Sequence, residues 1–170
     1  AVAGLEALVS RRSAVVEEVA EQVELAWEQA RLRRALGLRD GALEAAQKVV
    51  LRDPDHVAAR ALVAEIHATS GRLAEAAEAL AALAACRETP RAQRRAARLG
   101  AVEVYQRRPE QPVAAIAQLD ALVREGDADD AALARGLEIA QGAGLWEAAQ
   151  RFSIRQVERL PESTARVALL

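Results

Sequence analysis

The feature that most constrains this chain is a short pattern that recurs along it. A glycine followed five positions later by an alanine occurs in GLRDGALEAA (37–46), GRLAEAAEAL (71–80) and GLWEAAQRFS (144–153). Pro54 follows Gly37, and Pro161 follows Gly144, at the same spacing. This spacing is half the separation of Gly37 and Gly71. That separation is a period of about 34 residues, which is typical of proteins built from repeated supersecondary units.

Between these glycines and prolines, the chain has the apolar periodicity of α-helices. Good helix formers dominate these segments, and glycine and proline lie between them. Hydrophobic residues make up 52% of the chain but aromatic residues only 2%, so alanine, leucine and valine supply the apolar surface. Small side chains of this kind fill a core only where helices pack closely, and we therefore predict an all-α fold.

Each recurring residue type has a physical role at its position. A glycine after a helix can adopt the left-handed conformation that caps the helix and reverses the chain. An alanine early in the next helix permits close approach of two helices, where a larger side chain would overpack. Proline cannot continue a helix. One helix pair cannot bury its own apolar face, so the pairs are expected to stack on one another.

On these residues the chain resembles the tetratricopeptide repeat family over residues 23–163. The first unit spans 23–56 with Gly37, Ala42 and DPDH, and the second spans 57–92 with Gly71 and Ala76. The third, 93–129, has a Leu99–Gly100 pair but neither the turn glycine nor the closing proline, and it turns through RRPEQP at 107–112. The fourth spans 130–163. The resemblance implies a right-handed α–α superhelix. A bacterial source is expected as well.

The two ends of the chain lie outside the repeat pattern. Residues 1–22 have a helical pattern, which we interpret as an N-terminal extension or cap that could be continuous with the helix through Trp27. Residues 164–170 are expected to start a further or capping helix, with the hydroxyl of Ser163 as its N-cap.

The sequence offers little evidence for a catalytic or metal-binding site. His56 and His67 do not have the spacing of a helical metal pair. DADD at 127–130 lacks the ligand pattern of a calcium loop and suits a helix N-terminus. The single cysteine, Cys86, excludes an internal disulfide and reads as a packing residue. The sequence has no glycine-rich phosphate loop. We therefore predict a protein that is not an enzyme and uses no cofactor or metal.

The resemblance implies instead that the first helices line a concave groove for a peptide or partner protein. Its register places the following partner-binding residues there: Trp27, Arg31, Leu62, Glu65, Arg94, Arg98, Tyr105 and Arg135. Arg94 and Arg98 are one helical turn apart, so they are expected to point the same way and to bind an acidic or C-terminal segment. They match part of the carboxylate clamp by which some family members bind chaperone tails. Trp27 and Leu62 replace polar donors of that clamp, and Arg31 replaces an asparagine.

Other classes of partner fit the sequence less well than a peptide in this groove. The formal charge of −2 and the scarcity of aromatic residues argue against nucleic acid. No apolar run approaches the length of a membrane span, so no membrane insertion is expected. The alternative that stays open is a self-associating structural module, a homo-oligomer assembled through the apolar ends of the array.

Overall fold

The part of the chain that the structure describes folds into a row of eight α-helices. The computed structural model describes residues 2–107 and 110–160, with side chains from residue 18 onward. The helices are α1 (Val2–Ala35), α2 (Arg39–Arg52), α3 (Val57–Thr69), α4 (Leu73–Ala85), α5 (Arg91–Gln106), α6 (Pro112–Arg124), α7 (Asp130–Gly142) and α8 (Trp146–Arg159). The described residues contain no strand, which confirms the predicted all-α class.

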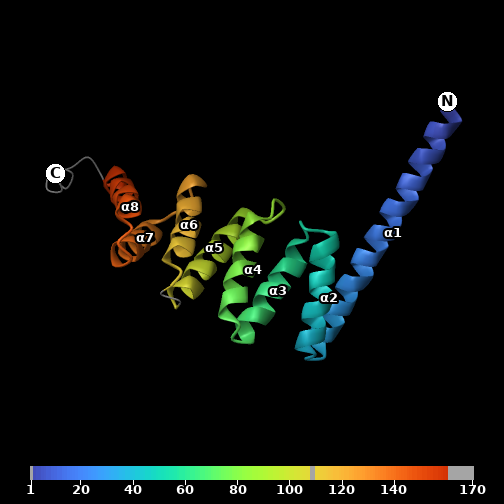
Figure 1. Ribbon diagram of the computed structural model, residues 1–170, viewed down its shortest axis with the longest axis horizontal. Helices are drawn as coiled ribbons and strands as arrows, with labels where there is room; N and C mark the ends of the chain where they lie inside the picture. Colours follow the sequence, from blue (N-terminus) through green and yellow to red (C-terminus); the bar gives the residue numbers. More distant parts are fainter. Residues whose placement is uncertain (1, 108–109, 161–170) are drawn as a thin grey trace.

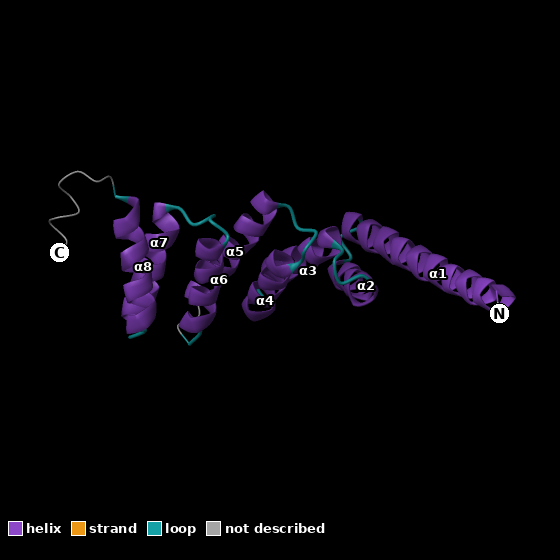
Figure 2. Ribbon diagram, turned by 90° about the horizontal axis from the view of Figure 1, so that it is seen from above, coloured by secondary structure: helices purple, strands orange, loops and turns teal. Residues whose placement is uncertain are grey.

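Consecutive helices pack as antiparallel pairs, and the pairs follow one another in an open, bowed row (Figure 1). The second helices α2, α4 and α6 lie along one side of this row, and α3 and α5 lie along the other (Figure 2). Two faces result, which we call the first-helix face and the second-helix face. The C-terminal segment expected to cap the array lies outside the described residues.

Helix α1 is much longer than the others. It has 34 residues and runs unbroken through the proposed N-terminal extension into the first repeat. Its C-terminal part packs against α2 and α3 through Val23, Ala26 and Ala30. Its N-terminal part extends away from the rest of the row (Figure 1).

The recurring glycines have the conformation predicted for them. Gly37, Gly71 and Gly144 have φ values of 74°, 71° and 68°, in the left-handed region. In each turn, the amide after the glycine donates back to a carbonyl five positions earlier, as in Leu145 N to Ala140 O at 2.8 Å. The structure adds Gly126, with φ 72°, which makes the same turn after α6.

The alanines that follow these glycines are buried. Ala42 and Ala76 are fully enclosed and Ala149 nearly so, as expected for small residues between packed helices. Gly136 shows the same closeness within the last pair, because a Cβ atom there would lie only 2.7 Å from the ring of Phe152. The core is thus a series of small apolar clusters between adjacent helices, and the largest surrounds Phe152.

A row of ion pairs joins α5 to the loop between α6 and α7. Arg91 contacts Asp127 at 2.6 Å, Arg95 contacts Asp129, and Arg98 contacts Glu125 at 2.6 Å. The Arg91 guanidinium, by its hydrogen bond and its charge, holds the pKa of Asp127 below its usual value. The arginine run RAQRRAAR therefore binds the acidic loop EGDADD of its own chain. Asp129 also caps α7, since its Oδ1 accepts the amide of Ala132 at 2.8 Å.

Candidate functional site

Two of the predicted groove residues lie in the core, and a third packs against it. Leu62 is buried among residues of α1 and α2, and Tyr105 packs on Ala77, Ala101 and Ala115. Trp27 is half-buried, with its ring centroid 5.0 Å from that of His56. These side chains hold neighbouring helices together, so a partner can reach at most their edges.

The polar residues predicted on the first two units are exposed. Glu65 accepts two hydrogen bonds from Arg34, at 2.6 and 2.8 Å, and so joins α1 to α3. Arg31 is exposed on α1, and the structure gives it no ion pair with another described residue. Neither Arg31 nor Glu65 lines a described hollow together with predicted residues of the third or fourth unit.

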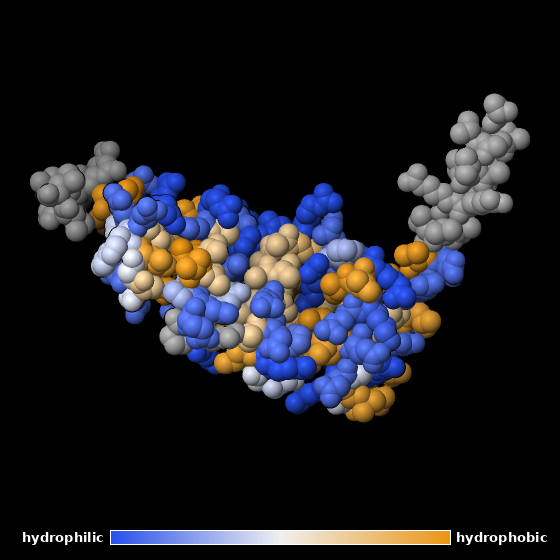
Figure 3. Space-filling view, in the orientation of Figure 1, coloured by the Kyte–Doolittle hydropathy of each residue, from blue (hydrophilic) through white to orange (hydrophobic). Residues whose placement is uncertain are grey.

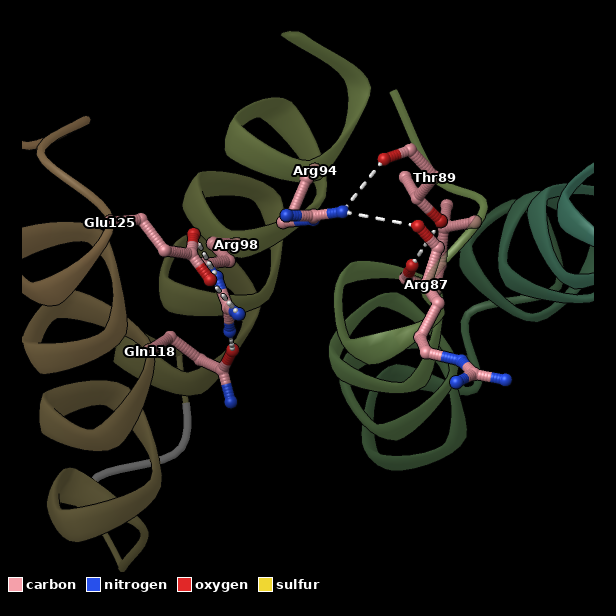
Figure 4. Close-up of polar contacts among 7 residues, drawn as sticks. Arg87, Thr89, Arg94, Arg98, Gln118 and Glu125 are labelled. Atoms are coloured by element: carbon pink, nitrogen blue, oxygen red, sulfur yellow. Dashed lines mark hydrogen bonds and ion pairs between the residues drawn. The ribbon is translucent and has the colours of Figure 1, made fainter. Parts of the chain in front are cut away.

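Arg94 and Arg98 point in different directions, so the expectation of a two-arginine clamp is wrong in its geometry (Figure 4). Arg94 donates to the carbonyls of Arg87 and Thr89, at 3.4 and 3.0 Å, in the loop that precedes α5. Arg98 donates to both carboxylate oxygens of Glu125, at 2.6 and 3.0 Å, and to Gln118. Their positions on α5 are close, but long side chains diverge toward different acceptors, and both guanidinium groups hold the fold together.

Arg135 lies in an open groove. The groove runs between α5 and α7 on the first-helix face, with a volume of about 760 Å³. On its α5 side lie Ala96, Leu99 and Gly100. Two carboxylates also line it, Glu103 and Asp129, and these pair with Arg107 and Arg95. Arg135 and Glu138 lie on its α7 side, and the structure gives neither an ion pair or hydrogen bond with the described side chains. Arg135 and Glu138 thus present a charged donor and a charged acceptor above a surface that a peptide backbone can approach closely.

A second hollow lies on the second-helix face, between α6 and α8. It has a volume of about 600 Å³, with an apolar floor that includes Val123, Phe152 and Ile154. Arg151 spans it to Asp120 at 2.8 Å, and Arg155 pairs with Glu158. Apolar surface is visible over this part of the second-helix face in Figure 3. The polar groups at its rim are mostly paired with each other, in contrast to Arg135 and Glu138 of the α5–α7 groove.

The candidate catalytic residues serve the fold. Nδ1 of His56 accepts the amide of Ala59 at 3.1 Å and so caps α3. Cys86 is buried, and its Sγ donates to the carbonyl of Asp55 at 3.3 Å. His67 is buried in α3; desolvation, with a smaller effect from the positive charge of Arg72, lowers its pKa below the ordinary value. Within the described ranges, no cluster of three acidic, histidine or cysteine side chains could hold a metal ion.

Comparison of the chain with protein-family models, curated proteins and solved structures finds no match. In the part of the chain that the structure describes, no helix is both long and apolar enough to cross a membrane. The assignment of a function therefore rests on the geometry of the surfaces described above.

Proposed function

We propose that the protein is a tetratricopeptide-like scaffold that binds an extended segment of a partner protein in the α5–α7 groove. The observation that carries this proposal is Arg135, an arginine with no ion pair to the described residues, above a floor of small side chains. Arg94 and Arg98 are occupied by the fold, and Arg31 is exposed on α1 away from this groove, whereas Arg135 is available to a ligand. The recurring glycine and alanine positions support the family resemblance.

The groove suits a segment that presents a carboxylate to Arg135. A guanidinium can donate two parallel hydrogen bonds to a carboxylate, from an acidic side chain or a chain terminus. Glu138, one turn further along α7, can accept a backbone amide of the same segment. Because Ala96 and Gly100 have little or no side chain, the segment can lie close to α5. The expected ligand is an extended acidic or C-terminal peptide.

The test is a titration with a labelled acidic peptide that ends in a free carboxylate, followed by fluorescence anisotropy. Arg135→Ala should weaken binding by about tenfold, since charge-assisted hydrogen bonds contribute about 1.5–3 kcal/mol. Arg124→Ala is the matched control, because Arg124 is an exposed arginine on α6, outside the groove. If Arg135→Ala bound the peptide as tightly as the wild type, or if binding did not saturate, the proposed binding site in the groove would be wrong.

One observation favours a second candidate, self-association through the array ends. Leu25, Leu32 and Leu36 are large and exposed on α1 at the N-terminal end of the row. Light scattering over a concentration series separates the two candidates, because only self-association makes the mass rise with concentration. A constant monomer mass would eliminate this second candidate and would not affect the proposal that the groove binds a peptide.

A further inference from the structure

The exposed leucines at the N-terminal end form one row along α1. Leu25, Leu32 and Leu36 are separated by steps of seven and then four, which places them on the same helix face. Their exposed fractions are 58%, 61% and 65%, although the opposite face of the same helix segment is buried through Val23 and Ala30. Uncovered leucines in regular register mark a face that another helix can cover.

The repeat register shows what this leucine face corresponds to. Ala59 and Ile66 of α3 lie one repeat after Leu25 and Leu32. Both are buried in clusters with residues of α1 and α2, the pair that precedes α3. The equivalent face of a first helix therefore receives a helix from the preceding pair, and in α1 the described residues leave it uncovered.

The opposite end of the row differs. Leu80 and Leu83 of α4 pack with residues of α5. When Gly71 is aligned with Gly144, Leu80 and Leu83 of α4 correspond to Ser153 and Gln156 of α8. These polar side chains border a shallow hollow at the C-terminal end. Leu137, Val157 and Leu160 line the same hollow, so the difference between the two ends lies at these two register positions, which hold polar residues on α8.

Acidic residues flank the leucine face. Glu21 and Glu28 follow one edge of it at heptad spacing, and the structure gives neither carboxylate an ion pair with a described residue. Two copies that met antiparallel through this face would bring the same edges together, and like charges repel. Charge complementarity favours a helix with basic residues on the facing edge.

We propose that the leucine face of α1 binds an amphipathic helix of another protein. This helix carries leucine and alanine on its buried side and arginine or lysine, at heptad spacing, on the edge that meets Glu21 and Glu28. It takes the place that α2 has against α3. Leu32 is the central anchor, because it lies between Leu25 and Leu36 along the face.

The probe is a labelled synthetic helix of about 20 residues, long enough to be helical in water, with this leucine–alanine stripe and lysines on one edge. Its control has glutamates in place of the lysines. We expect saturable binding of the lysine helix and at least about tenfold weaker binding of the glutamate helix. Leu32→Glu should weaken the lysine helix at least about tenfold, whereas Val113→Glu, at a similarly exposed position on α6, should not.

Several results would overturn this proposal. Equal binding of the lysine and glutamate helices would show that the carboxylates of Glu21 and Glu28 do not determine which helix binds. Unchanged binding by the Leu32 variant would show that the helix does not bind to the leucine face. Self-association of the wild type that Leu32→Glu abolishes would show that a second copy covers the face. Arg135→Ala should leave this binding unchanged, so the outcome is independent of the α5–α7 groove.

Discussion

Single residues set how closely the helices of this array approach one another. Where Gly71 and Gly144 reverse the chain, the sequence alone predicts the conformation, because few residues other than glycine adopt a positive φ. Gly136 could not be predicted in the same way. Its role depends on the ring of Phe152 on the next helix, a contact that appears only when the two helices are packed.

Gly136→Ala should therefore destabilise the protein by about 1–3 kcal/mol, since the added methyl group meets a fully buried ring that cannot move aside. Gly142→Ala is the control in the same helix. Nothing lies within 4 Å of a Cβ atom there. The gain in helix propensity should thus leave the stability of that variant unchanged or raised by up to about 1 kcal/mol. Urea unfolding measures both, and equal stability of the two variants would contradict the packing of α7 on α8.

His67 gives the fold a pH dependence of known sign. Desolvation lowers its pKa in the folded state, so below about pH 6.5 the unfolded chain takes up a proton more readily than the folded protein. The stability linked to His67 is thus complete above its unfolded pKa and is lost as the pH falls toward the folded value. Unfolding measured from about pH 7.5 to about pH 5 should show a smaller decline in His67→Gln than in the wild type. Parallel curves would show that His67 does not titrate in this way.

At the scale of elements, α5 shows where inference from the sequence stops. The arginine run lies at the start of α5, and the helical pattern of the sequence does not identify the partners of that run. The acidic loop that it binds lies about one repeat further along the chain, at 125–129. Opposite charges separated by about one repeat are a usable signal, since Arg34–Glu65 and Asp120–Arg151 have nearly the same separation. Side-chain direction is not predictable in this way, because Arg94 and Arg98 diverge beyond their Cβ atoms.

Arg98→Ala should cost about 2 kcal/mol of stability, because it leaves the half-buried carboxylate of Glu125 without its partner. Arg107→Ala removes a pair with Glu103 in which both side chains are more than 60% exposed. That control should change stability by less than about 1 kcal/mol. Thermal or urea unfolding compares the two, and a similar effect of both substitutions would refute the structural role assigned to Arg98.

At the scale of the whole molecule, the helical periodicity and the recurring glycines predict the all-α row of helix pairs. The binding surfaces are less predictable from the sequence. Whether a side chain at a given repeat position is exposed and unpaired depends on the contacts that the neighbouring helix pair makes with it. Arg135 has no ion pair with the described residues where Arg98 is occupied, although the register predicts both for the same groove. The leucine face of α1 is visible only by comparison with the buried face of α3.

The central claim is that these helices form an open row and do not close into a bundle. Small-angle X-ray scattering of the monomer tests it most directly. A compact domain of this length would have a radius of gyration of about 15 Å. The open row predicts a radius of gyration well above that value and a distance distribution with a long tail. A radius equal to that of the compact domain, with a symmetric distribution, would contradict the open row.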